Sequence, residues 1–274
     1  MKCYTSAKFR LKSAGLIIAI LILSVAASAQ TDDDEDYIVP VRPSVSESAN
    51  IQKKGVLQIE TGGDFDFRSP EFRSAQSSSL GIYFAATQRL RLDFEFEPVV
   101  SEKDLMNRRE TGIGDVSLGF KTVIREQPEK KLAVAFSYSI KLPTAGADKD
   151  LGTGKIDHNL RLIFDRSIGK NDYSANVSYL NVGREMSGKR DSGAQIILRY
   201  DRKLTKNVEI INELFGNTVD EEQPRGIYYQ GAFTYKLNKR LQLDVGVRPG
   251  FGHDAPRIGI LGGIVVGVGK AHRK

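Results

Sequence analysis

Apolar and polar residues alternate at every second position through most of this sequence. The clearest example is Leu-Arg-Leu-Asp-Phe-Glu-Phe-Glu at residues 90–97, where four hydrophobic side chains alternate with four charged ones. Side chains on a β-strand point to opposite faces with a period of two, so this segment is predicted to be a strand between an apolar and a polar environment. Twelve segments are strand candidates: 57–67, 79–86, 90–97, 115–124, 131–141, 156–165, 173–179, 194–201, 208–215, 227–237, 241–248 and 257–268.

Residues 1–29 are predicted to be a secretory signal peptide. Basic residues at positions 2, 8, 10 and 12 precede an apolar stretch and the small-residue cleavage site Ala27-Ser28-Ala29. The apolar stretch is shorter than the roughly 20 residues of a membrane-spanning helix, which disfavours an uncleaved anchor. Removing four basic residues lowers the formal charge from +6 to +2. The basic balance of the whole chain therefore does not indicate nucleic-acid binding.

Residues 30–54 are predicted to form an extended, solvated periplasmic segment ahead of a barrel domain at residues 55–274. The segment contains the acidic run 32–36 and two prolines, Pro40 and Pro43, and it follows neither the helical nor the strand period. Calcium binding by the acidic run is an alternative. A solvated tail is preferred because five adjacent like charges repel one another and lack a loop geometry.

The alternation is compatible with two folds, a membrane barrel with its apolar face towards lipid and a soluble β-protein with that face inside. The strands have about nine to twelve residues, close to the ~9–11 that cross a bilayer and longer than the ~5–6 typical of soluble sheets. Long loops alternate with short turns, as in Pro98–Thr111 followed by Arg125–Lys130. The absence of tryptophan, and of an aromatic residue at positions 269–274, favours the soluble alternative. We predict an all-β fold, a single antiparallel up-and-down transmembrane barrel of about 12 strands in a bacterial outer membrane, with the N-terminus in the periplasm.

The charged face of this barrel is predicted to line its lumen. An arginine at the bilayer midplane costs roughly 2–4 kcal/mol, so a one-residue slip of the strand at 90–97 is strongly disfavoured. A twelve-stranded barrel encloses a space between the filled eight-stranded barrel and the open ~16-stranded porin. We expect a narrow pore or cavity lined by ion pairs between neighbouring strands. The candidate lumen-lining residues are Arg91, Asp93, Glu95, Asp115, Lys121, Arg161, Arg199, Lys236, Asp244 and Arg248.

Other chemistry finds little support in the sequence. The only cysteine, Cys3, lies in the signal, and three histidines at positions 158, 253 and 272 are too scattered for a metal site, so no metal and no cofactor are expected. The stretch Asp150–Lys155 fails as a phosphate-binding loop because Lys149 replaces the first glycine and Ile156 replaces Ser or Thr. An outer loop that turns on glycine is expected there.

An enzymatic barrel is an alternative with one candidate residue, His158. It shares the apolar face with Leu160 and Leu162, whereas the serines at positions 137, 139, 174 and 178 point to the lumen in this register. No neighbouring serine would reach His158, so an interfacial histidine is expected and no catalytic role is assigned.

Three short motifs resemble a known bacterial family. They are Arg42-Pro43 with Glu47-Ser48 and Gly55 before the first strand, Gly112-Ile113-Gly114-Asp115 at the fourth strand, and Leu142-Pro143-Thr144-Ala145-Gly146 after the fifth. Together they are similar to the outer-membrane transporters associated with the meta-pathway of phenol degradation. The resemblance implies a barrel that helps small, often aromatic, compounds across the outer membrane, and it brings no catalytic residues with it.

The sequence therefore favours a passive outer-membrane transporter for small organic solutes. Its expected partners are outer-membrane lipid, the solute and the outer-membrane assembly machinery. A structural or surface-interaction barrel without transport activity is the alternative, because alternation reports the wall of a barrel and not what crosses it.

Overall fold

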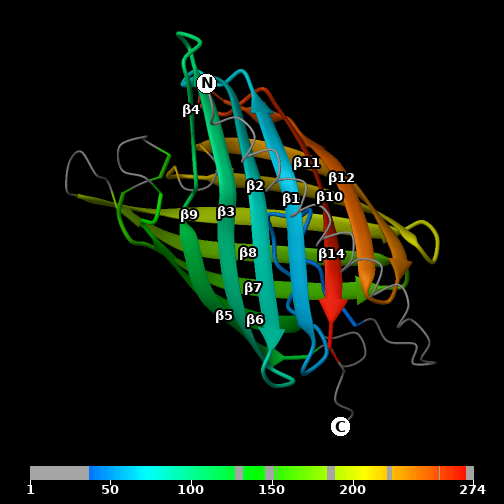
Figure 1. Cartoon of the computed structure of the whole chain (residues 1–274). Helices are drawn as coiled ribbons and strands as arrows, with labels where there is room; N and C mark the ends of the chain where they lie inside the picture. Colours follow the sequence, from blue (N-terminus) through cyan, green and yellow to red (C-terminus); the bar gives the residue numbers. More distant parts are fainter. Residues whose placement is uncertain are drawn as a thin grey trace, which may run out of the picture.

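The alternating segments form antiparallel strands that close into one barrel (Figure 1). The computed structural model describes residues 37–126, 132–145, 151–152, 154–183, 189–220, 224–252 and 254–269. The predicted signal peptide and the acidic run at 32–36 lie outside these residues. The strands are β1 (Leu57–Phe67), β2 (Phe72–Ala85), β3 (Leu90–Asp104), β4 (Arg109–Gly112), β5 (Val116–Arg125), β6 (Ala133–Leu142), β7 (Asp157–Ile168), β8 (Asn171–Gly183), β9 (Arg190–Lys203), β10 (Val208–Asn217), β11 (Gly226–Asn238), β12 (Leu241–Arg248), β13 (Gly250–Phe251) and β14 (Ile258–Val268).

Twelve of these strands form the wall. Each pairs with the next in chain order, and β14 pairs with β1 from Leu57↔Val268 to Phe67↔Ile258, which closes the ring. The two short strands β4 and β13 only extend the pairing of β3 and β11. The prediction of a twelve-stranded up-and-down barrel is confirmed.

The two faces of the wall differ as the alternation predicts. On β3 the side chain of Arg91 is 1% exposed, whereas its neighbour Leu92 is 48% exposed. Phe233 and Val245 on the outer face are likewise more than half exposed. An apolar face of this extent is stable only against hydrocarbon, so the barrel belongs in the outer membrane. In the part of the chain that the structure describes, no helix is long and apolar enough to cross a membrane.

One predicted loop is instead a hairpin. Residues Pro98–Thr111 were expected to be a long loop, but β3 continues to Asp104 and pairs with β4. Pro98 and the adjacent pair Val99-Val100 break the alternation, so the sequence does not mark the extension of β3 as strand. At the other end of the barrel, short turns join β2 to β3, β7 to β8 and β11 to β12. We call this the short-turn end.

The register of β10 and of β14 is explained by the contents of the lumen. On β10, Ile211 and Phe215 point inward and are about 2% exposed, so this strand is apolar on both faces. Phe215 stacks on Tyr228 of β11 with the ring centroids 4.9 Å apart. On β14 the inward positions include glycines, such as Gly263, which faces the lumen opposite Gly62 of β1.

Candidate functional site

Residues 37–56 run through the barrel lumen, and we call them the luminal segment (Figure 1, dark blue). Both of its ends lie at the short-turn end, where the N–H of Tyr37 donates to the carbonyl of Lys239 and the N–H of Gly55 donates to that of Ala85. Between them the chain passes from one wall to the other, so the segment is a loop held inside the barrel. The expectation of a solvated extension is therefore corrected for residues 37–54. That expectation failed because a polar lumen can bury the same residue types that water solvates.

Three carboxylates of the wall satisfy the backbone of the luminal segment. An extended segment leaves its N–H groups without intra-segment partners, and buried N–H groups need acceptors. The hydrogen bonds run from the N–H groups of Val41 and Arg42 to Glu60 (2.8 and 2.7 Å), of Val45 and Ser46 to Glu213 (2.9 and 3.1 Å), and of Ala49 to Asp165 (2.7 Å).

Side-chain amides of the wall complete this backbone recognition. Gln58 accepts from the N–H of Val39 and donates to its carbonyl, both at 2.9 Å. Asn176 binds the N–H of Glu47 at 2.8 Å and its carbonyl at 3.1 Å. These two-sided contacts imitate a strand pairing with side chains in place of a neighbouring backbone, so the wall fixes the path of the segment as well as its side chains.

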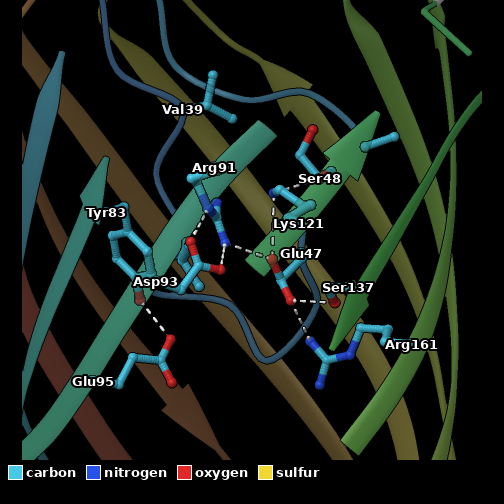
Figure 2. Close-up of polar contacts among 12 residues, drawn as sticks. Val39, Glu47, Ser48, Tyr83, Arg91, Asp93, Glu95, Lys121, Ser137 and Arg161 are labelled. Carbon is cyan, nitrogen blue, oxygen red and sulfur yellow. Dashed lines mark hydrogen bonds and ion pairs between the residues drawn. The ribbon is translucent and has the colours of Figure 1, made fainter. Parts of the chain in front are cut away.

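Glu47 lies at the centre of the most highly charged contact (Figure 2). Its Oε2 is 2.7 Å from an Arg91 guanidinium nitrogen and 3.3 Å from Lys121 Nζ. Its Oε1 is 3.5 Å from Arg161 and accepts a hydrogen bond from Ser137 at 3.0 Å. Residues on β3, β5, β6 and β7 thus converge on one carboxylate of the luminal segment. We call Arg91, Lys121 and Arg161 the cation cluster.

The environment of Glu47 favours its ionised form. Burial by itself would raise the pKa of this carboxyl, but Lys121, Arg91 and Arg161, together with the Ser137 hydrogen bond, outweigh that effect and hold the pKa well below its usual range. Glu47 therefore stays charged throughout the physiological pH range.

Arg42 forms a second anchor on the opposite wall. Its guanidinium donates to Ser79 at 3.0 Å and to Asp244 at 3.3 Å, and it lies 3.7 Å from Asp64. It rests on the backbone of Gly62 and Gly263, where any Cβ would overlap the guanidinium. These two paired glycines thus form the slot that admits Arg42.

Apolar residues of the luminal segment fill the remaining contacts. Ala49 packs on Ala133, Ala135 and Ile163, all fully buried. Val45 packs on the cluster that contains Phe215, which accounts for the inward-facing hydrophobic residues of β10. The inner wall is therefore shaped for this segment in both polarity and size.

The predicted lumen-lining residues fall into separate groups. Arg91, Lys121 and Arg161 meet at Glu47, and Asp93 pairs with Arg91 at 2.6 Å. Two of the other candidates contact a neighbouring strand: Glu95 of β3 accepts from Tyr83 of β2 (2.8 Å), and Asp115, next to β5, is 3.8 Å from Lys141 of β6. Three have partners elsewhere: Asp244 pairs with Arg42, Arg199 with Asp201 on its own strand (2.6 Å), and Arg248 with Asp64 and Asp66 of β1 (3.1 and 3.2 Å). Lys236 lies partly buried at an inward position of β11. Pairing between neighbouring strands is therefore found for some charges, as between Lys141 of β6 and Asp157 of β7 (2.6 Å), while others bind charges that the luminal segment supplies.

Arg42 and Glu47 were identified from the sequence only as parts of a family motif, and Glu60 and Glu213 were not among the candidate lumen residues. The alternation that marks a lumen-facing residue is clear for Glu60, which alternates with apolar residues on β1. Glu47 had no such signal, because it lies in a segment without periodicity and its partners are 44 to 114 residues away in the chain.

His158, the one candidate for catalysis, lies on the outer face. Its Nδ1 is 2.9 Å from the hydroxyl of Tyr138, and the two rings are stacked with centroids 6.2 Å apart. Ser137 next to Tyr138 points to the lumen and binds Glu47, so it does not face the histidine. The geometry is that of an aromatic pair at the barrel surface.

Comparison with known proteins agrees with this architecture. The COG4313 outer membrane channel from Pseudomonas putida F1 superposes with a TM-score of 0.61 at 13% identity, over 87% of this chain and 100% of that chain. The KdgM porin, solved in complex with disordered oligogalacturonate, superposes with a TM-score of 0.51 at 11% identity, over 76% of this chain and 98% of that chain. Likeness at this identity shows the fold. No curated protein sequence matches the chain.

A family model covers most of the sequence. It matches residues 41–266, a range that includes most of the luminal segment and all of the wall except the last two residues of β14. Its description reads "Putative MetA-pathway of phenol degradation". The resemblance inferred from the short motifs is confirmed, and the chain belongs to this family of outer-membrane barrels.

Proposed function

We propose that the protein is a channel for passive passage of small organic solutes across the outer membrane, and that the luminal segment is its closing element. The polar, water-compatible lumen inside an apolar exterior supports passage of a solute rather than storage of a lipid. The family description supports solutes of the class met in phenol degradation. The short-turn end then faces the periplasm, as is usual for such barrels.

The observation that carries this proposal is the way the luminal segment is held. It is joined to the wall by hydrogen bonds and ion pairs and not by strand pairing, and it enters and leaves at the same end. Such a loop can leave the lumen without breaking the ring of twelve strands. The structure is thus the closed state of the proposed channel.

A structural barrel without transport is the second candidate, and the filled lumen favours it. A segment that stays permanently docked would act as a core, in the way that side chains fill small barrels. The two candidates differ in what loosening the segment does. In a channel it opens a path, and in a structural barrel it lowers stability alone.

A double substitution distinguishes them. Arg42→Gln with Glu47→Gln removes both charged anchors and keeps a polar side chain at each position. Lys54→Gln with Glu110→Gln removes the same charges from exposed positions and is the matched control. In liposome-swelling assays with arabinose, we expect the first protein to pass solute at least about tenfold faster than the control, the equivalent of 1.4 kcal/mol in docking. Equal rates for two correctly inserted proteins would reject the channel in favour of the structural barrel.

A further inference from the structure

The cation cluster surrounds a single carboxylate, an arrangement that closing the lumen does not by itself require. Glu47 is the one acidic residue between positions 37 and 56, and it is placed where three cations from three strands converge. Both of its oxygens are engaged by separate donors, Oε1 by Ser137 and Arg161 and Oε2 by Arg91 and Lys121. This is the two-oxygen arrangement by which proteins recognise a carboxylate.

The charges of the wall do not balance without Glu47. Among the described ion pairs, Asp93 is the one wall carboxylate joined to the cation cluster, through Arg91. If Glu47 leaves the lumen, the positive charges of Lys121 and Arg161 therefore lose their ion-pair partner. A buried cation without a counter-charge is costly. An open lumen would therefore attract an anion to this position.

An apolar surface lies directly beside the cation cluster. In the pairing of β6 with β7, Ser137 is opposite Arg161, and the next inward-facing pair is Ala135 opposite Ile163. Two residues along a strand correspond to about 7 Å. Ala135 and Ile163 are covered by Ala49 of the luminal segment, so the movement that frees the cations also uncovers an apolar patch. The distance between the cation cluster and this apolar patch suits a ligand whose carboxylate is attached to a single ring or to a short hydrocarbon chain.

We propose that the cation cluster and its apolar neighbour form a binding site for small organic carboxylates, such as aromatic acids, and that Glu47 with Ala49 occupies it as an internal substitute. The proposal rests on the proposed channel function and names the solute class for it. The solute and the luminal segment then compete for one site. Competition raises the apparent dissociation constant of the solute to its intrinsic value divided by the fraction of barrels that are open.

The test compares benzoate with benzamide, its neutral isostere, on the full exported chain in detergent micelles. Glu47→Gln removes the internal competitor, and Glu110→Gln is the exposed control. We expect Glu47→Gln to bind benzoate at least about tenfold more tightly than the unchanged and control proteins do, as for a competitor weakened by 1.4 kcal/mol. Benzamide should bind equally weakly to all three. The gain should disappear when Lys121→Met is added, and Arg161→Gln provides a second variant should the first not migrate as a folded barrel.

Either of two results would overturn the anion site. One is equal binding of benzoate and benzamide to Glu47→Gln, and the other is a benzoate gain that survives loss of the cluster lysine or arginine. The channel function fails separately, in liposomes. If neither benzoate nor benzamide crosses with Glu47→Gln, the channel is rejected, while the micelle titration still decides the anion site.

Discussion

The slot formed by Gly62 and Gly263 makes a prediction about how the lumen is closed. The two glycines lie opposite each other in the pairing of β1 with β14 and both face inward. A methyl group at either position overlaps the guanidinium of Arg42, whereas neither glycine has an unusual backbone conformation. Gly62→Ala should therefore leave the wall intact and displace Arg42.

The size of the effect follows from the contacts of Arg42. Its displacement breaks the ion pair with Asp244 at 3.3 Å and the hydrogen bond to Ser79 at 3.0 Å, while Asp64 keeps Arg248 at 3.1 Å. Asp244 is 8% exposed and is left without its cation. Removing one partner of a buried pair costs about 3–5 kcal/mol, and at the lower figure the ratio of docked to undocked segment falls roughly a hundredfold.

Single-channel recordings in planar bilayers measure this ratio as open probability. The matched control is Gly262→Ala, one residue away on the lipid-facing side of β14, where the added methyl group meets only the carbonyl oxygen of Asp244 at 3.4 Å. We expect frequent openings with Gly62→Ala and the behaviour of the unchanged protein with Gly262→Ala. In an Arg42→Ala background Gly62→Ala should add nothing, because both changes remove the same anchor.

Equal open probabilities for Gly62→Ala and Gly262→Ala would refute the reasoning. An effect of Gly62→Ala that persists in full without Arg42 would also refute it, since the methyl group would then act on the wall and not on the luminal segment. Heat-modifiable migration in detergent gels verifies that each protein is a folded barrel before it is recorded.

Four further outcomes are expected. Replacing Arg91 and Glu95 with Ala should shift the reversal potential in a salt gradient, because both line the lumen and the first belongs to the cation cluster; identical potentials would contradict this placement. Leu198→Arg on the outer face should destabilise the barrel by roughly 2–4 kcal/mol in urea titrations in lipid, whereas arginine at the tip of the β3–β4 hairpin should not. His158→Ala should leave esterase activity at background, and a loss of activity would restore the enzyme hypothesis. Because the pKa of Glu47 is lowered in the folded protein, its stabilisation is complete above the ordinary glutamate pKa and is lost only as the pH falls through the lowered value. The difference in open probability between the unchanged protein and Glu47→Gln should therefore be the same at pH 7 and pH 5, and a smaller difference at pH 5 would contradict the pKa argument.

The wall could be predicted from sequence because its two environments impose a local rule. Lipid on one side and polar surroundings on the other select the residue type at every second position. The faces of Arg91 and Leu92 can therefore be predicted from the alternation alone, without knowing which residues they contact. The candidate lumen residues were found by the same rule. Their partners were not, because pairing depends on which distant segment enters the lumen.

The luminal segment could not be predicted for a related reason. Ser46 hydrogen-bonds Glu213, which lies 167 residues away, and Gln230 donates to the carbonyl of Pro43 across 187 residues. A serine- and proline-containing stretch has the same composition whether its N–H groups bind water or wall carboxylates. The inward-facing Phe215 was a usable signal, since a charged lumen with an apolar residue in it implies that something apolar packs there.

The difference between the wall and the luminal segment explains how a chain with so many contacts can still move. A strand that leaves the wall exposes its N–H and C=O groups to hydrocarbon, which offers no partner, so the ring stays closed. When the luminal segment leaves, water takes over its hydrogen bonds to Glu60, Glu213 and Asp165. Each such exchange costs only about 0.5–1.5 kcal/mol. The charged anchors at Arg42 and Glu47 are the contacts that water replaces least well, so they determine how often the segment leaves, and a solute that satisfies the cation cluster in place of Glu47 lowers the cost of opening.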